Sequence, residues 1–160
     1  MKKKTLDEND FDIFVIGGGV NGAGILRDAA GRGYKCGLAD MGDFGSATSS
    51  SSTKLFHGGL RYLESYQFRL VKESLRERDL LVNLMPHISW PVKFILPHNK
   101  SLRPYWILRL GLYIYDLLAG STNFSKSVGI DLRNNPVGSC LDKSYTRALV
   151  YTDCWVEDSR

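Results

Sequence analysis

A glycine-rich turn, Gly17-Gly18-Gly19-Val20-Asn21-Gly22, is the part of this chain whose residue types and spacing most directly indicate chemistry. It follows a short apolar run and opens an apolar-periodic segment, the arrangement that places a pyrophosphate on the N-terminus of a helix. In that role Gly17 supplies the tight turn, Gly19 lets the diphosphate approach the backbone, and Gly22 lets helix and strand pack closely. The alternative is a plain glycine turn that binds nothing.

An acidic residue stands where a dinucleotide site needs one. Asp40 closes the next apolar stretch, Cys36-Gly37-Leu38-Ala39, at about the spacing of a carboxylate that binds ribose hydroxyls. A glycine pattern alone is weak evidence. With a strand before it, a helix after it and this acid, it predicts a dinucleotide site, although Asp40 is alternatively a turn acid at a strand end.

Small and hydroxyl residues dominate residues 41–53. By composition this segment resembles a disordered linker. A linker is not normally followed at once by a stretch such as residues 54–64, Lys-Leu-Phe-His-Gly-Gly-Leu-Arg-Tyr-Leu-Glu, which mixes packing residues with polar chemistry. The segment is therefore also a candidate for ligand contact.

Apolar periodicity predicts the elements that position these residues. Residues 11–16 and 36–40 are expected as strands around a helix at 21–32, which makes a β-α-β unit. Further helices are expected at 69–84 and 104–118, a loop at 128–138, and a strand at 147–152. In the helix at 69–84 the inward side chains are Leu70, Val71, Leu75, Leu81, Val82 and Leu84, and the solvated ones are Lys72, Glu73, Arg76, Glu77 and Arg78. No second domain is indicated. Asp158 or Ser159 suits the N-cap of a helix, but almost no residues follow to form that helix. The chain is therefore expected to be truncated.

Composition limits the possible functions. The 160 residues are 43% hydrophobic and carry a net charge of +4, which suits an anionic cofactor, an anionic substrate or an acidic lipid surface. The basic residues are dispersed, so no nucleic-acid binding is expected. The three cysteines form no CxxC pair and indicate reduced thiols in a cytosolic protein, and no metal site is expected. Residues 1–10 form a polar tail without the apolar core of a signal peptide, and no apolar run is long enough to span a bilayer.

Several motifs together resemble the FAD-dependent glycerol-3-phosphate dehydrogenases. They are residues 11–40, Ala47 to Leu55, His-Gly-Gly-Leu-Arg-Tyr-Leu-Glu at 57–64, Leu102-Arg103-Pro104, Gly111 to Asp116, and Tyr151 to Val156. The resemblance implies an α/β fold, a Rossmann-type FAD-binding domain with a parallel sheet and flanking helices. Residues 11–160 would be its N-terminal part, ending before most of the substrate domain.

The resemblance also implies an activity. Such enzymes bind FAD, oxidise sn-glycerol 3-phosphate to dihydroxyacetone phosphate and pass the electrons to membrane quinone. They are cytoplasmic and sit peripherally on the inner face of the cytoplasmic membrane. The alternatives are a related oxidase that uses oxygen, or a non-catalytic FAD-binding module. The isolated chain is expected to be inactive.

The resemblance assigns roles to single residues. Arg61 and Tyr62 would contact the substrate phosphate, with a surface salt bridge and a packed core tyrosine as their alternatives. His57 would serve in proton transfer near the flavin or, equally, be a structural histidine beside the glycines. The resemblance also implies cofactor contacts by Thr48, Ser49, Ser50, Thr53, Lys54 and Leu55. Residues 80–115 mix aromatics with cations, which suits either a packed core or a lipid headgroup layer.

Overall fold

The computed structural model describes residues 11–157, which form two compact units that meet in the sequence between Lys54 and Leu55. The sequence had indicated no second domain. Composition does not indicate this boundary, because the serine-rich residues before it and the motif after it resemble one continuous ligand-binding segment. The polar tail at 1–10 and the expected helix cap at Asp158 or Ser159 lie outside the described residues.

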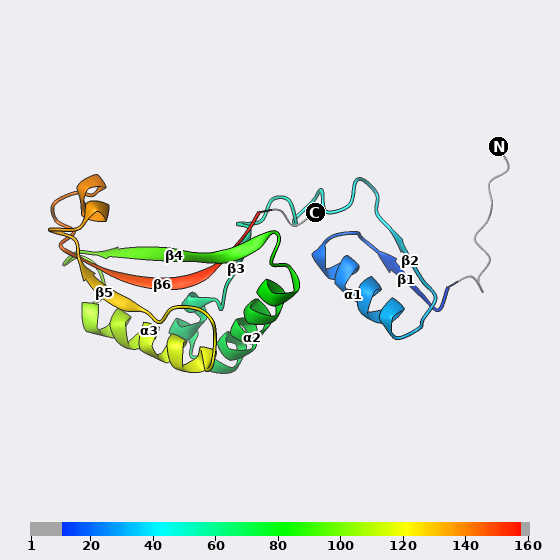
Figure 1. The fold of residues 1–160 in the computed structure, drawn as a ribbon, viewed down its shortest axis with the longest axis horizontal. Helices are drawn as coiled ribbons and strands as arrows, with labels where there is room; N and C mark the ends of the chain where they lie inside the picture. The colour runs from blue at the N-terminus through cyan, green and yellow to red at the C-terminus, as the bar shows by residue number, and fades with distance from the viewer. Residues whose placement is uncertain (1–10, 158–160) are drawn as a thin grey trace. The chain divides into compact units, whose positions relative to one another are not determined.

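The first unit contains the expected β-α-β arrangement. Strand β1 (Ile13–Ile16) leads into helix α1 (Val20–Gly31) and then strand β2 (Cys36–Ala39). The two strands pair in parallel, with Ile13 opposite Cys36 and Ile16 opposite Ala39, and α1 is the crossover that parallel pairing requires (Figure 1). The Rossmann-type βαβ unit predicted from the glycine turn is confirmed.

Residues 41–53 fold back onto the glycine turn. The Gly45 N–H donates to the Gly18 carbonyl at 3.0 Å, and the Ser50 N–H donates to the Gly45 carbonyl at 3.0 Å. The segment is therefore a chain of hydrogen-bonded turns, and the disordered-linker interpretation of its composition is wrong.

The second unit is built on an antiparallel sheet. Its strands are β3 (Leu55–Phe56), β4 (Ser89–His98), β5 (Val128–Asp131) and β6 (Arg147–Val156). Strand β6 is central: β4 pairs along its whole length, and β3 and β5 pair with its two ends on the other side. Because β6 has a partner strand on each side, six of its ten residues are buried and two are half-buried, and Ala148 and Leu149 are buried completely.

Two α-helices lie on one face of this sheet (Figure 1). Helix α2 (Phe68–Leu84) follows a short 3-10 helix, η1 (Leu60–Ser65), and helix α3 (Tyr105–Ala119) begins directly after Pro104 and ends at Gly120. They match the expected helices to within one residue at each end. The core between them contains Val71, Leu75 and Tyr115, against which Leu60, Leu63, Leu118, Ala119 and Tyr151 pack.

Two expectations about this unit are wrong, and one of its strands was not expected at all. Strand β4 was not foreseen, because Pro91 and Pro97 interrupt its pattern; an edge strand tolerates proline, since the missing N–H faces away from its single partner. Residues 128–138 are not simply a loop, since they contain β5 and the start of the 3-10 helix η2 (Pro136–Cys140). Strand β6 continues to Val156 beyond the expected Thr152.

The inward face of α2 also differs from the prediction. Arg78, expected in water, is only 2% exposed, whereas Leu70 and Leu84, expected inside, are 39% and 47% exposed. Val71, Leu75 and Arg78 follow each other at helical spacing on one narrow stripe. An arginine can occupy that stripe because buried acceptors surround its guanidinium.

Candidate functional site

The glycine turn in the first unit has the geometry that its sequence predicts. Gly17 has a positive φ of 105°, a left-handed conformation that favours glycine. A Cβ on Gly22 would lie 1.9 Å from the Gly17 carbonyl oxygen, so only glycine permits this close crossing of turn and helix. The structural parts of the prediction for Gly17 and Gly22 are therefore confirmed.

The start of α1 offers donors to an anion. Gly19 caps the helix without any side-chain hydrogen bond, and the Val20 N–H donates to the Ser49 hydroxyl at 3.0 Å. Within residues 11–157, the N–H groups of Asn21 and Gly22 find no acceptor. Unsatisfied N–H groups and the helix dipole favour negative charge at this point.

Asp40 is tied to the same turn. Its carboxylate accepts from the Gly18 N–H at 2.6 Å and from the Gly42 N–H at 2.9 Å. Both hydrogen bonds lower the pKa of Asp40 below its ordinary value, and the bond from Gly42 has the larger effect. An ionised carboxylate accepts about four hydrogen bonds, so capacity remains for ribose hydroxyls.

The hydroxyl segment approaches the turn through Ser49. Ser49 is 8% exposed, and its Oγ would lie 3.1 Å from a Cβ on Gly19. Ser50 is turned inward, because its hydroxyl donates to the Gly45 carbonyl at 2.6 Å, while Thr48 and Thr53 are exposed. Lys54 has a positive φ of 55° at the unit boundary, and Leu55 belongs to the second unit, where it pairs with Trp155. The structure thus divides the six predicted cofactor contacts between two units.

These residues fit the diphosphate and ribose part of a dinucleotide. A cradle that a side chain on Gly19 would fill, helix N–H groups without acceptors, and a carboxylate at the end of β2 are the features such a ligand needs. Contact of each named residue with a cofactor stays a prediction.

In the second unit the predicted substrate residues flank a glycine pair. His57 precedes Gly58-Gly59, and η1 then carries Arg61 and Tyr62. All three predicted side chains are exposed, Tyr62 to 43%. Arg61 forms no ion pair with any residue from 11 to 157, so the salt-bridge alternative has no support there, and the exposure of Tyr62 contradicts the packed-core alternative.

The hydrogen bond of His57 restricts what its ring can do. The Gly59 N–H donates to His57 Nδ1 at 2.9 Å, so Nδ1 is an acceptor. A neutral ring then carries its proton on Nε2 and presents a donor there. In this arrangement His57 is suited to donate a hydrogen bond through Nε2 and is not suited to remove a proton with that atom.

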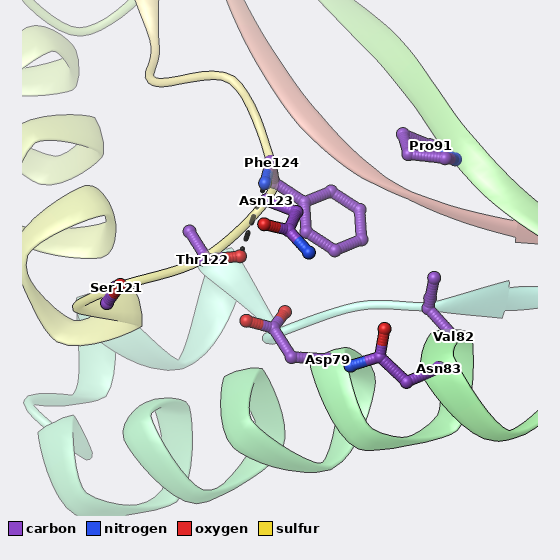
Figure 2. Close-up of a pocket in the computed structure, with 8 residues that line it drawn as sticks. All are labelled: Asp79, Val82, Asn83, Pro91, Ser121, Thr122, Asn123 and Phe124. Carbon is purple, nitrogen blue, oxygen red and sulfur yellow. Dashed lines mark hydrogen bonds between the residues drawn. The ribbon is translucent and has the colours of Figure 1, made fainter.

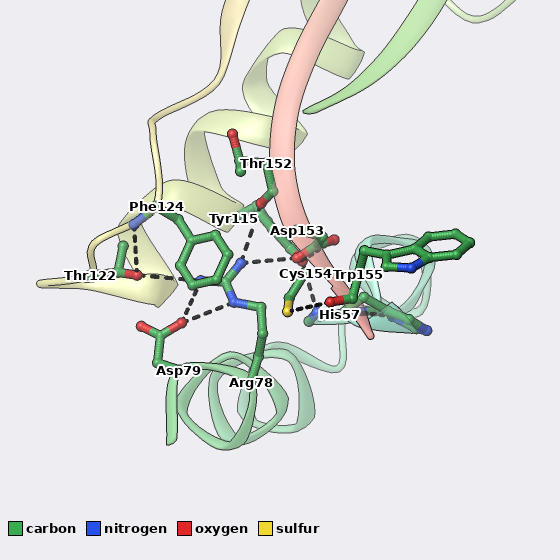
Figure 3. Close-up of polar contacts among 12 residues, drawn as sticks. His57, Arg78, Asp79, Tyr115, Thr122, Phe124, Thr152, Asp153, Cys154 and Trp155 are labelled. Carbon is green, nitrogen blue, oxygen red and sulfur yellow. Dashed lines mark hydrogen bonds and ion pairs between the residues drawn. The ribbon is translucent and has the colours of Figure 1, made fainter. Parts of the chain in front are cut away.

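A buried polar network lies directly behind this turn (Figure 3). The Tyr115 hydroxyl accepts from the Gly58 N–H at 2.8 Å and donates to the Asp153 carboxylate, whose two oxygens lie 2.9 and 3.0 Å away. Arg78 Nη1 donates to the same carboxylate at 2.9 Å. Three elements, α2, α3 and β6, are thereby joined to the glycine pair.

The guanidinium of Arg78 is fully enclosed by partners. It also donates to the Asp79 carboxylate at 2.7 Å and to the Thr152 carbonyl at 3.3 Å, and it lies 3.8 Å from the centre of the Phe124 ring. Burial disfavours its charge, but the hydrogen bonds to Asp153 and Asp79 outweigh burial and raise its pKa. Arg78 therefore remains a buried cation.

Burial also affects the protonation of Tyr115 and Asp153, the other two residues of the buried network. It raises the pKa of Tyr115, and the Asp153 carboxylate raises it further, so the hydroxyl keeps its proton. Burial also raises the pKa of Asp153, against the hydrogen bonds from Arg78 and Tyr115. No side-chain nitrogen or oxygen that is buried among the described residues lacks a partner, so the network is fully satisfied.

A surface hollow lies beside Asp79 and Phe124, two of the residues that contact Arg78. It is lined by Asp79, Val82, Asn83, Pro91, Ser121, Thr122, Asn123 and Phe124 (Figure 2). None of the site residues predicted from the sequence lines it. Residues 11–157 contain no group of three or more His, Cys, Asp or Glu side chains arranged to hold a metal ion. Within the same range, no helix is long and apolar enough to cross a membrane.

Comparison with known proteins identifies the family. Residues 12–160 match the family described as FAD dependent oxidoreductase. The chain belongs to this family. Its fold is the FAD-binding fold, and FAD is the cofactor on which the family depends.

Curated members of the FAD dependent oxidoreductase family are similar over nearly all of the chain. The D-erythritol 1-phosphate dehydrogenase of Brucella abortus is 54% identical over 149 residues, which are 93% of this chain and 30% of that protein. The aerobic glycerol-3-phosphate dehydrogenase of Escherichia coli is 50% identical over 93% of this chain and 29% of its own length. The chain therefore spans about three tenths of these relatives.

A solved structure is similar as well. The glycerol-3-phosphate dehydrogenase of Bacillus halodurans, complexed with FAD, is 28% identical and superimposes with a TM-score of 0.61 over 94% of this chain and 23% of its own. The family resemblance expected from the motifs is confirmed.

Sequence reasoning missed the buried network. The signal for Arg78 was present, because it continues the inward stripe of Val71 and Leu75, but its charge placed it on the solvated face. Tyr115 and Asp153 stand inside two of the motifs that carried the family resemblance, with no role assigned to them. Gly18 was also left out, although its N–H binds Asp40 and a Cβ there would lie 2.3 Å from the Phe44 ring.

Proposed function

We propose that this chain contributes the N-terminal, FAD-binding part of an enzyme that oxidises a polyol phosphate. The preferred substrate is sn-glycerol 3-phosphate, the product is dihydroxyacetone phosphate, and the electrons go to quinone. The observation that carries the proposal is the extent of the similarity. An alignment of 149 residues at about half identity is longer than either compact unit, so it includes both the glycine turn and the turn at 57–62.

A second substrate has a specific observation in its favour. The relative with 54% identity is named a D-erythritol 1-phosphate dehydrogenase, and the glycerol-3-phosphate dehydrogenases of Escherichia coli and Pseudomonas tolaasii are 50% and 48% identical. Glycerol 3-phosphate and erythritol 1-phosphate share a phosphate monoester next to hydroxyl-bearing carbons. A phosphate-binding arginine would serve both substrates. The turn at 57–62 therefore supports the class of phosphorylated polyols more strongly than it supports one of the two compounds.

The chemistry divides between cofactor and protein. FAD, when bound, supplies the acceptor for the hydride from the carbon that bears the secondary hydroxyl. Arg61 is proposed to hold the phosphate, because a guanidinium grips phosphate oxygens through two parallel hydrogen bonds, and Tyr62 adds a hydroxyl. His57 is proposed to donate a hydrogen bond from Nε2 to a substrate oxygen, a narrower role than the proton transfer that the family resemblance implied. The hydroxyl proton would go to a base that the described residues do not supply.

The cofactor contacts form the other half of the proposal. The N–H groups at the start of α1 would receive the diphosphate and Asp40 the ribose, with Thr48, Ser49, Ser50, Thr53, Lys54 and Leu55 beside the cofactor. The exposed start of α1 and the Ser49 hydroxyl at Val20 support the diphosphate assignment.

Peripheral attachment to the inner face of the cytoplasmic membrane belongs to the same proposal. Helix α3 exposes an apolar stripe at helical spacing: Trp106 (67%), Leu110 (50%), Tyr113 (60%) and Leu117 (68%). Tryptophan and tyrosine are the residues that favour the headgroup layer. The core-packing alternative for the aromatics of 80–115 applies to Tyr115, which is 2% exposed, but not to Trp106 or Tyr113.

Steady-state turnover of the protein expressed from its complete gene tests this function. We expect turnover of sn-glycerol 3-phosphate with a soluble quinone analogue and little hydrogen peroxide in air. Preference for D-erythritol 1-phosphate would move the assignment to the second substrate, and stoichiometric peroxide would identify an oxidase. The isolated 160-residue chain is expected to bind FAD weakly and to turn over neither substrate.

A further inference from the structure

The buried network behind the Gly58-Gly59 pair has no part in the proposed chemistry, yet it ends on the backbone of the proposed substrate turn. The Gly58 N–H is buried and has one acceptor, the Tyr115 hydroxyl at 2.8 Å. The next N–H, that of Gly59, is bonded to His57 Nδ1 at 2.9 Å. The two consecutive N–H groups of this turn are thus both held, that of Gly58 by buried Tyr115 and that of Gly59 by the proposed substrate-binding side chain of His57.

The space around Gly58 makes this attachment specific. A Cβ on Gly58 would lie 2.5 Å from Leu75 and 2.6 Å from the Tyr115 hydroxyl. The backbone therefore sits directly against side chains of α2 and α3. Gly59 follows in a left-handed conformation, with φ of 68°, and starts η1.

The direction of the Tyr115 hydroxyl is set by charge. The hydroxyl donates its hydrogen bond to Asp153, whose two carboxylate oxygens lie 2.9 and 3.0 Å away and which is also paired with Arg78 at 2.9 Å. The hydroxyl lone pairs then face the Gly58 N–H. Arg78 and Asp153 are 2% and 4% exposed as side chains, so water does not compete for these bonds.

We infer that Tyr115, oriented by the Arg78–Asp153 ion pair, is a positioning residue that fixes the Gly58-Gly59 turn and through it His57, Arg61 and Tyr62. This inference rests on the proposed function for its substrate, a phosphorylated polyol. It requires that loss of one hydroxyl group, more than 50 residues away in the sequence, changes substrate use while leaving FAD in place.

The chain provides a matched control. Tyr151 lies next to Tyr115, with ring centres 6.1 Å apart, and packs against the same core. Its hydroxyl makes no hydrogen bond to any described residue. Tyr115→Phe and Tyr151→Phe therefore remove the same atom from the same cluster, and only the first leaves a buried N–H without an acceptor.

The test compares both variants in the FAD-loaded protein expressed from its complete gene. In Tyr115→Phe we expect hydrogen exchange in the peptide spanning residues 57–62 to accelerate about tenfold and the KM for sn-glycerol 3-phosphate to rise about tenfold. The kcat and the FAD content should stay within about twofold. Tyr151→Phe should match the unmodified protein in every measurement.

Three results would overturn the inference: equal behaviour of the two variants, a loss of FAD that accompanies the rise in KM, or faster exchange with an unchanged KM. Arg61→Ala separates this from the proposed function. If Arg61→Ala leaves the KM unchanged, the phosphate assignment fails, and the exchange measurement still decides whether Tyr115 holds the turn.

Discussion

Arginine residues of the second unit illustrate how burial decides the role of a side chain. Arg61 and Arg78 have the same charge and lie on neighbouring elements. Arg61 is exposed and unpaired within residues 11–157, so its hydrogen-bonding capacity is available to a ligand. Arg78 is enclosed by two carboxylates, a carbonyl and an aromatic ring, so its capacity is already used within the fold.

Replacing Arg61 should therefore affect substrate use and little else. We expect Arg61→Ala to lower kcat/KM for sn-glycerol 3-phosphate about 10- to 100-fold, the value of one or two charge-assisted hydrogen bonds. Arg61→Lys should recover part of the loss, because charge is kept and the planar fork is not. Steady-state kinetics together with the flavin content check this; equal losses of activity and FAD would remove Arg61 from the substrate site.

Replacing Arg78 should affect stability. Arg78→Met leaves Asp153 buried without its cation, and we expect the free energy of unfolding to fall by about 3–5 kcal/mol. Arg76→Met on the same helix is the control, since Arg76 is exposed and its change should stay within about 0.5 kcal/mol. Denaturant titration measures both. A similar effect of the two variants would contradict a structural role of the ion pair.

Among the elements, the βαβ unit was the easiest to predict and the antiparallel sheet the hardest. The glycine turn, the apolar run before it and Asp40 after it are local signals, and the structure places β1, α1 and β2 accordingly. Strand β4 is defined by its pairing with β6, from Ser89 with Val156 to His98 with Arg147, and its two prolines conceal it locally. The apolar pattern of β6 was readable on its own, but nothing in it indicates which segment pairs with it.

Helix α1 contains an internal comparison between two glycines. A Cβ on Gly22 would meet the Gly17 carbonyl at 1.9 Å, whereas a Cβ on Gly24 would meet nothing within 4 Å. We expect Gly22→Ala to destabilise the protein by about 1–3 kcal/mol and to lose FAD. Gly24→Ala should gain about 0.5–1 kcal/mol and keep FAD, because alanine is the better helix former. Thermal unfolding and flavin absorbance report both effects; retention of FAD in Gly22→Ala would contradict the close crossing.

The junction of β2 with the glycine turn should depend on pH through Asp40. Its folded-state pKa is lowered by the N–H groups of Gly42 and Gly18, so its contribution to stability is present above the unfolded-state value of about 4 and is lost as the pH falls through the lowered folded-state value. The difference in unfolding free energy between the unmodified protein and Asp40→Asn should be constant from about pH 5 to 7 and shrink below about pH 4. A difference that is independent of pH would show that the carboxylate charge is not used.

At the scale of the whole molecule, the two units carry different parts of the proposed site. The first holds the predicted diphosphate and ribose contacts, and the second holds His57, Arg61 and Tyr62 on the network of Tyr115, Asp153 and Arg78. Motifs revealed the first set and the exposed members of the second. The network could not be predicted, because it joins α2, α3 and β6 through contacts that exist only after folding.

Anaerobic reduction of the bound flavin tests the central claim, that a phosphorylated polyol is oxidised at this FAD site. The protein expressed from its complete gene is loaded with FAD and mixed with sn-glycerol 3-phosphate, and the flavin absorbance band is followed with Arg61→Ala in parallel. We predict rapid bleaching in the unmodified protein and, at the same subsaturating substrate concentration, bleaching at least about tenfold slower in the variant. A flavin that stays oxidised with both sn-glycerol 3-phosphate and D-erythritol 1-phosphate would contradict the account.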